Sequence, residues 1–192
     1  AFAPPRRGAI HLINSDFITV QDLTIRGADI GVWVDGGSDD TIIQRNTITA
    51  GWGVLALAEL NGTRMQRTSI LSNDISLNPL SDMLPSNPRH WFIWKTFRYD
   101  SATFIDGART NIVLYESGAG TIVDGNTIHD GFAGILFFSA VPGSTAIHQQ
   151  AVVSNNTIFN LSSTGMSIWP GQGLRAYRNR LTNVQSGFRF GH

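Results

Sequence analysis

Short stretches in which apolar and polar residues alternate run along the whole chain. Clear examples are segments 47–49 and 166–168, and the wholly apolar segments 32–34, 112–114 and 135–137 take the place of 166–168 in other repeats. A period of two is that of a β-strand, in which successive side chains point to opposite faces. Each repeat of the pattern holds three such pieces, for example 31–35, 41–44 and 47–49. The pattern predicts an all-β protein built from short strands.

A phrase of the form Asn-x-Ile or Asn-x-Leu recurs at 46–48, 73–75, 126–128, 156–158 and 179–181, and Leu23 takes the asparagine place once. A small residue then opens the next strand: Gly31, Gly53, Asn111, Gly134, Gly165 and Gly187. The steps from 23 to 46 and from 156 to 179 are both 23 residues. A fixed period in the twenties is typical of solenoids, whose repeats bury their apolar faces by stacking. Three strands per repeat predict a parallel β-helix.

The repeated asparagine has a structural explanation. At a tight corner its side-chain amide can bond the asparagines of the neighbouring repeats and satisfy backbone groups that water cannot reach. We therefore expect Asn46, Asn126 and Asn156 to be buried and stacked. A role as simple turn former would explain one asparagine, but not five at a matched place.

This repeat resembles that of the right-handed parallel β-helix superfamily, which has pectate-lyase-like repeats. The resemblance covers residues 9–192 apart from one insertion, and implies a single domain over 1–192 with six coils and part of a seventh. The superfamily includes polysaccharide lyases, glycoside hydrolases, uronan epimerases and phage tailspikes. It thus implies a protein that acts on a polysaccharide or glycan. The alternative is a non-catalytic binding or structural module, adhesin-like or spike-like.

One insertion interrupts the regular spacing. The strand after Asn73 opens only at Asn111, so the additional residues occupy about 77–108. This stretch is rich in aromatic residues, which argues against disorder. It can be interpreted as a flap packed on the flank of the solenoid or as a binding loop. We expect residues 80–107 to cover part of the first-strand surface, with Trp91 and Trp94 buried.

The outward side chains of the first strand in each repeat are unusually apolar. They form two rows: His11, Trp33, Leu55, Val113, Leu136, Ser167 and Arg189, and Ile13, Asp35, Leu57, Tyr115, Phe138, Trp169 and Gly191. A surface this apolar is usually covered by other parts of the protein or binds a partner or ligand. The first interpretation is a face covered by the inserted loop or a subunit. The second is a groove whose rings stack on sugars.

The resemblance implies a cleft along this face, and four carboxylates fall at its rim: Asp35, Glu59, Glu116 and Asp130. A glycosidase needs two carboxylates, whereas a lyase or epimerase needs a base and a cation. The candidate sugar-binding residues are Trp33, Tyr115, Phe138, Trp169, Lys95, Arg98 and Arg189. We expect Glu116, Tyr115 and Asp130 to lie within reach of one sugar. The competing interpretation is that Glu116 only caps a turn.

The sequence departs from the enzymes of the superfamily at several places. The Asp39–Asp40 pair follows a first strand, whereas polygalacturonases carry theirs before it, and segment 132–134 replaces their Gly-His-Gly. We interpret Asp39 and Asp40 as turn residues. His129 is expected to be a solvated rim residue, with a catalytic alternative that depends on Asp130. No counterpart of the Ca²⁺-binding aspartates of pectate lyases stands out, so no cofactor is predicted.

Composition adds few constraints. The net charge is zero and the pI about 7.2, which gives no indication of a nucleic-acid partner. There is no run of about 18 apolar residues to span a membrane. Sequons at Asn61, Asn155 and Asn160 are compatible with an extracellular or periplasmic location. The final strand would leave an open solenoid end, so we expect an oligomer or a missing chain segment there.

Overall fold

The computed structural model describes residues 8–57, 64–77, 110–115, 117–138, 148–168 and 171–190. All regular structure in these ranges is β-strand, which confirms the all-β prediction. The strands are β1 (Gly8–Ile13), β2 (Thr19–Gln21), β3 (Thr24–Asp35), β4 (Ile42–Gln44), β5 (Thr47–Leu57), β6 (Ser69–Leu71), β7 (Asp74–Leu77), β8 (Thr110–Tyr115), β9 (Ile122–Asp124), β10 (Thr127–Gly131), β11 (Ala133–Phe138), β12 (Val152–Ser154), β13 (Thr157–Ile168), β14 (Arg175–Tyr177) and β15 (Arg180–Phe190). In the described part of the chain, no helix has the length and apolar character that a membrane span requires.

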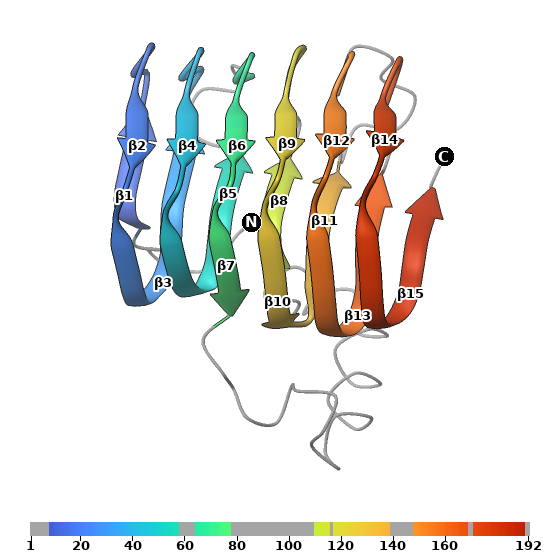
Figure 1. Ribbon diagram of the computed structural model, residues 1–192. Coiled ribbons are helices and arrows are strands. Elements are labelled where there is room, and N and C mark those ends of the chain that lie inside the picture. Colours follow the sequence, from blue (N-terminus) through green and yellow to red (C-terminus); the bar gives the residue numbers. More distant parts are fainter. Residues whose placement is uncertain are drawn as a thin grey trace, which may run out of the picture.

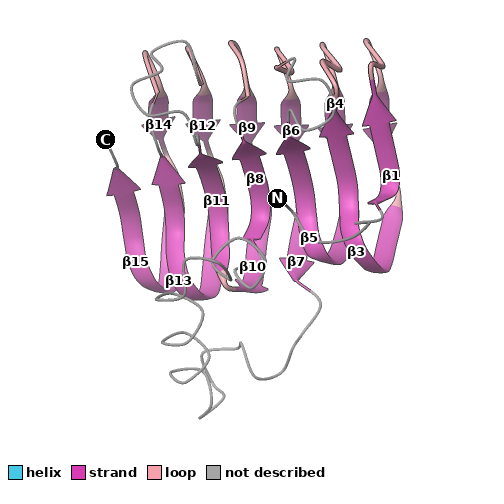
Figure 2. Ribbon diagram, turned by 180° about the vertical axis from the view of Figure 1, so that it is seen from behind, coloured by secondary structure: helices cyan, strands magenta, loops and turns pink. Residues whose placement is uncertain are grey.

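The strands form two sheets, and all their described pairings are parallel. The short strands β2, β4, β6, β9, β12 and β14 make a six-stranded sheet, and the remaining nine strands make the other sheet. Successive repeats lie side by side, from β1, β2 and β3 at one end to β14 and β15 at the other (Figure 1). Seen from behind, β1, β5, β8, β11, β13 and β15 cross the back of the molecule (Figure 2). Each passage of the chain therefore adds one strand to the six-stranded sheet.

The strand register confirms the alignment of the repeat. Ile48 pairs with Ile25 on one side and with Ile75 on the other, and Ile128 pairs with Ile75 and Ile158. The first outward row is also in register from His11 to Arg189, each member paired with the next. Equivalent positions of the repeat thus lie directly beside one another.

The structure differs from the prediction in the number of separate strands. The third strand of one repeat and the first strand of the next were expected to be distinct, but β3, β5, β13 and β15 run through the bend as single strands of 11 or 12 residues. The glycine row lies at this bend. A Cβ atom at Gly53 would overlap the Cγ2 atom of Ile75 and the carbonyl of Asn111. The absent side chain lets the backbone curve tightly over the interior without breaking the ladder.

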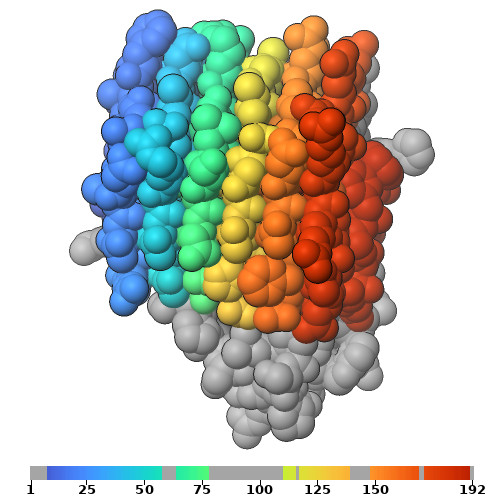
Figure 3. All heavy atoms as spheres, in the orientation of Figure 1, coloured from blue at the N-terminus to red at the C-terminus, as the bar shows by residue number. Residues whose placement is uncertain are grey.

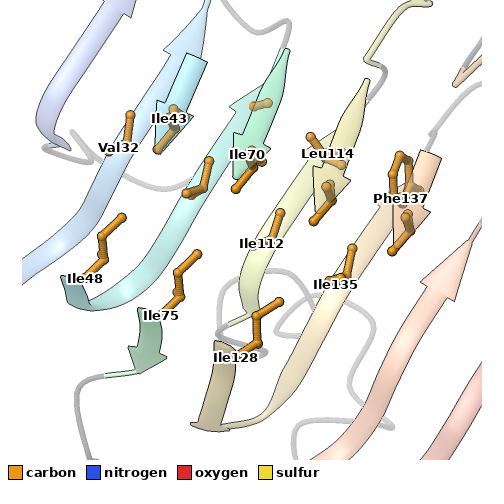
Figure 4. Close-up of a cluster of buried hydrophobic side chains, with 14 of the residues drawn as sticks. Val32, Ile43, Ile48, Ile70, Ile75, Ile112, Leu114, Ile128, Ile135 and Phe137 are labelled. Carbon is orange, nitrogen blue, oxygen red and sulfur yellow. The ribbon is translucent and has the colours of Figure 1, made fainter. Parts of the chain in front are cut away.

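The interior between the two sheets is filled with aliphatic side chains. Ile43 and Ile70 of the six-stranded sheet are fully buried, as are Ile48, Ile75 and Ile112 of the other sheet. Figure 4 shows them in rows that follow the stacking direction. Since Ile and Val are stiff at χ1 and fit a pleated surface, such rows suit stacked strands. This buried core is the main reason why the repeats stay together.

The asparagine ladder is confirmed. Asn46, Asn73, Asn126 and Asn156 are at most 2% exposed. The backbone N–H and the Nδ2 group of each donate to the Oδ1 atom of the next ladder asparagine at 2.9–3.0 Å, and Asn179 is the last acceptor. Each Nδ2 group also donates to a backbone carbonyl, such as that of Ile70 for Asn126. The ladder therefore connects the corners of the repeats from Asn46 to Asn179.

The insertion separates β7 from β8. Residues 78–109 lie outside the described residues, and with them the expected flap and the expected burial of Trp91 and Trp94. Asn111 stands where other repeats have glycine, and its Nδ2 atom donates to the carbonyls of Ile75 and His129 at 3.0 and 3.2 Å. This amide links strands β7, β8 and β10 at the interrupted bend.

Candidate functional site

The members of the first outward row on β3, β5 and β8 are buried. Trp33 is 7% exposed, Leu55 1% and Val113 5%, and they form an apolar cluster with Trp52 that is separate from the interior core. Tyr115 packs against the margin of this cluster. We call the two outward rows of the first strands the first-strand face. Its part from Trp33 to Val113 is covered, and is not an open groove.

Asp35 is also inside this covered part. Its side chain is completely buried, and its Oδ1 atom accepts a 2.6 Å hydrogen bond from the backbone N–H of Gly36. Its Oδ2 atom lies 3.9 Å from Nε2 of His11, whose ring stacks on the indole of Trp33 at 4.0 Å between centroids and 11° between planes. Rings stacked across strands turn their edges outward, so Trp33 offers no flat platform for a sugar. Asp35 is out of reach of a large substrate while this face is covered.

The first-strand face is partly exposed further along, at Tyr115 and Phe138. These two side chains are neighbours in register, and their ring centroids are 5.4 Å apart with 39° between the planes. Arg189 is exposed at the end of the first outward row, next to Ser167. Several predicted site residues lie outside the described residues: Glu59, Lys95, Arg98, Glu116 and Trp169. Of the predicted set, Tyr115 and Phe138 are brought into contact.

Asp130 lies at the other end of the strand from Tyr115. It comes three residues before Ala133, which pairs with Thr110, whereas Phe138 pairs with Tyr115. Five residues of strand between those two pairs span about 17 Å. The register therefore separates Asp130 from Tyr115, and the two do not contribute to a site the size of one sugar.

Asp130 instead belongs to a polar cluster around His129. The Nδ1 atom of His129 is 2.8 Å from Oδ2 of Asp130, and its Nε2 atom is 3.0 Å from Oδ1 of Asp74. Asn160 donates to the other oxygen of Asp130 at 3.2 Å, and the imidazole stacks on Phe159 with 5.0 Å between centroids. The cluster thus joins β7, β10 and β13 on the outer side of the third strands.

This geometry limits the chemistry of the cluster. Each ring nitrogen of His129 faces a carboxylate oxygen, so the imidazole lies between Asp74 and Asp130 and links them. A glycosidase pair needs the sugar or a water between its carboxylates. Here the His129 ring occupies that space, so Asp74 and Asp130 cannot act as such a pair in this arrangement.

Sequence analysis missed Asp74 and Asn160 as partners of this cluster. The signal was present in the repeat, because Asp74 pairs with Thr127, two residues before His129, and side chains two residues apart share a face. Asn160 follows Phe159, the register partner of His129. The left-handed φ of 49° at Asp130 and 55° at Asn160 turns both side chains to the same side.

A second group that sequence analysis missed is fully buried. Oγ of Ser117 is 2.8 Å from Nδ1 of His148, and Nε2 of His148 is 3.1 Å from the carbonyl of Phe138. A carbonyl can only accept, so Nε2 carries the proton and Nδ1 accepts from the serine hydroxyl. Burial lowers the pKa of His148 from 6.5 to about 4, and the nearby Arg64 adds to this effect. These two bonds connect the corner after β8 and the end of β11 to the corner before β12.

Asp39 and Asp40 act in a corner, as expected. Asp40 has a left-handed φ of 53° and receives two hydrogen bonds from Arg67, at 2.7 and 2.8 Å. These bonds hold the pKa of the Asp40 carboxyl below its usual value. Asp39 accepts the backbone N–H of Gln66 at 2.8 Å. Both carboxylates thus bind the next repeat.

No known protein-family model matches this sequence, and neither does any curated protein. The case for a function therefore depends on the residues themselves.

Proposed function

We propose that this chain is a right-handed parallel β-helix of the pectate-lyase-like type that acts on a polysaccharide. The β-helix assignment is supported by the two parallel sheets, the 23-residue step and the buried asparagine ladder. Such a fold hosts many functions, so the fold alone does not identify the ligand. A polysaccharide ligand would agree with an extracellular or periplasmic location.

The observation that carries the proposal is the ring pair of Tyr115 and Phe138. Both side chains are half-buried, whereas Trp33, Leu55 and Val113 on the same face are covered. Their planes differ by 39°, so the rings are not closed against each other face to face. Half-buried aromatic rings of this kind suit the C–H face of a pyranose. Glu116 follows Tyr115 directly in the sequence, and we propose it as the catalytic carboxylate.

The other predicted residues have secondary roles in this proposal. Lys95, Arg98 and Arg189 would bind the carboxylates of a uronan, and Trp169 would extend the row after Phe138. Glu59 remains a second candidate acid. Asp35 and Asp130 are less suited to contact the same sugar, since Asp35 is buried and Asp130 lies at the far end of the strand.

A non-catalytic β-helix module is the second candidate. It is favoured by the polar groups that are already satisfied within the fold, because both carboxylates near His129 and the buried Ser117–His148 pair have partners in neighbouring repeats. In that case the ring pair would hold a glycan without any reaction, as in an adhesin or a spike.

A glycan panel separates these possibilities. Uronans and neutral glycans are tested for binding and for products with the wild type, Tyr115→Ala, Phe138→Ala and Glu116→Gln. Phe159→Ala is the matched control. Phe159 is also a half-buried ring, but it lies on a third strand, where it is stacked on its register partner His129. Binding lost in the first two variants and kept in the control supports the site. Products that disappear in Glu116→Gln while binding remains support an enzyme, whereas binding without any product supports the module. No response to any glycan would refute the proposal.

A further inference from the structure

The two end repeats expose apolar side chains that the inner repeats bury. We call residues 8–29 the first repeat and 171–190 the last repeat. Six large apolar side chains are exposed among the described residues, and all but Ile122 belong to these two repeats: Ile13, Phe17, Leu23, Tyr177 and Phe190. Phe190 is 75% exposed, although its register partner Ile168 is only 4% exposed. The two ends of the stack are therefore strand edges with apolar side chains beside them.

The two ends differ in charge. The last repeat has Arg175, Arg178, Arg180 and Arg189, and no acidic residue. The first repeat has Asp16, Asp22 and Asp29, and Arg26 as its single arginine. Two last repeats would repel each other, whereas a last and a first repeat attract. The two ends lie on opposite sides of the molecule (Figures 1 and 3).

The positions of these charges match in the register of the repeat. Asp22 and Arg178 occupy the same corner place, with left-handed φ values of 58° and 54°. Inside the chain, Arg45 at this place already binds Asp22 with two hydrogen bonds of 2.8 Å. The Asp22 oxygens can each accept a second hydrogen bond. An arginine on the other side of Asp22, one strand spacing away, would therefore make the same kind of ion pair, with the order of the two residues along the stack reversed.

The apolar residues match in the same register. Following the strand pairs from repeat to repeat, Phe188 is equivalent to Ile10 and Phe190 to Leu12. Ile10 and Leu12 are half-buried, as is Phe188. One more parallel step of about 4.8 Å between β15 and a second β1 would bring these inward rows into contact. The same step would add β2 of the second molecule to β14.

We propose that this protein associates head to tail, with the last repeat of one molecule stacked on the first repeat of a second copy. Arg178 of one copy pairs with Asp22 of the next, and Phe188 and Phe190 pack on Ile10 and Leu12. The contact joins two different surfaces and leaves one of each free at the ends of the assembly. Repetition therefore gives an open filament and not a closed dimer.

The asparagine ladder does not continue across this contact, so the contact should be weaker than the junctions between repeats inside the chain. Asn179 makes no hydrogen bond with its backbone N–H among the described residues, and inside the chain this N–H of each ladder asparagine is bound by the next Oδ1 atom. The first repeat has Leu23 at the ladder place, which offers no side-chain oxygen. One donor thus remains unpaired at each junction. Leu23→Asn supplies the missing acceptor and should tighten the association.

Charge reversal tests the register directly. Sedimentation velocity over a range of concentrations measures association of the wild type, Arg178→Glu, Asp22→Lys and the double variant. Each single reversal places like charges opposite each other and should weaken association at least about tenfold. The double variant, and an equimolar mixture of the two single variants, should restore it. Restoration also shows that the single variants still fold.

Further outcomes decide the proposal. Leu23→Asn should lower the concentration at which filaments form, and Gln21→Asn, a change in the neighbouring β2 strand, should not. A wild type that stays monomeric at all concentrations refutes the proposal. So does a closed dimer that does not respond to Asp22→Lys, because it would use another surface. Single reversals that associate as well as the wild type would exclude the Arg178–Asp22 contact.

Discussion

Replacement of Asn126 by alanine tests the ladder in the middle of the stack. Oδ1 of Asn126 accepts the backbone N–H of Asn73 at 2.9 Å and its Nδ2 group at 3.0 Å. Nδ2 of Asn126 donates to the carbonyl of Ile70 at 2.9 Å. Alanine leaves the two donors of Asn73 unpaired in a place that is 2% exposed. Because each buried unpaired group costs about 1–3 kcal/mol, Asn126→Ala should lower the free energy of unfolding by about 3 kcal/mol.

Asn179→Ala is the matched control. Asn179 is the last member of the same ladder and is half-buried, so water can take the place of its Oδ1 atom beside the two donors of Asn156. The cost should stay below about 1 kcal/mol. Thermal melts followed by circular dichroism should then show a loss of roughly 6–12 °C for Asn126→Ala and much less for Asn179→Ala.

Amide hydrogen exchange makes the test specific. In the wild type the Asn73 amide should be strongly protected, since it is buried and bound to Asn126. In Asn126→Ala this amide should exchange faster, whereas amides of the six-stranded sheet should change less. Equal destabilisation by the two alanine variants, or an unchanged Asn73 amide, would refute the reasoning that the ladder is structural.

Two more predictions concern buried positions. His148 has a pKa of about 4 in the folded protein and 6.5 when unfolded, so its stabilising contribution is complete above pH 6.5 and is lost as the pH falls toward 4. The loss should reach roughly 3 kcal/mol, because the unfolded chain takes up the proton first, and a pH series of denaturant melts should show it in the wild type but not in His148→Gln. Gly53→Ala should cost about 1–3 kcal/mol by overpacking, whereas Gly187→Ala, at the same place in the last repeat with nothing within 4 Å, should cost little in a thermal melt. Equal melting temperatures for the two glycine variants would show that the bend can move to make room.

Much of the fold could be predicted from the sequence because the repeat fixes neighbours as well as strands. A step of 23 residues predicts that Asn156 lies beside Asn179, whatever the handedness of the stack and the exact shape of its bends. The number of separate strands could not be predicted in this way. Whether the chain breaks or curves at Gly53 depends on how closely its backbone approaches Ile75, and no periodic pattern contains that distance.

The candidate site was harder to predict for a related reason. Alternation shows which side chains point outward, but not whether other parts of the chain cover them. Trp33 and Phe138 are both aromatic residues on the first-strand face, yet Trp33 is buried and Phe138 is half-buried. No repeated pattern in the sequence pointed to the Ser117–His148 pair, because this pair joins corners of irregular length. Contacts across corners depend on the lengths of the loops, which vary between repeats.

The distribution of satisfied polar groups links fold and function in this protein. In the described inner repeats, carboxylates and amides bind the next repeat: Asp40 to Arg67, Asp130 to Asn160, and the ladder asparagines to one another. Side chains bound in this way hold the stack together and are poorly available to a ligand. A binding surface is then expected where such bonds end. In the described part of the chain, we propose two such surfaces, the ring pair of Tyr115 and Phe138 and the arginine-rich last repeat. The first suits a neutral or acidic sugar and the second an acidic strand edge, so the glycan panel and the charge reversals test independent surfaces.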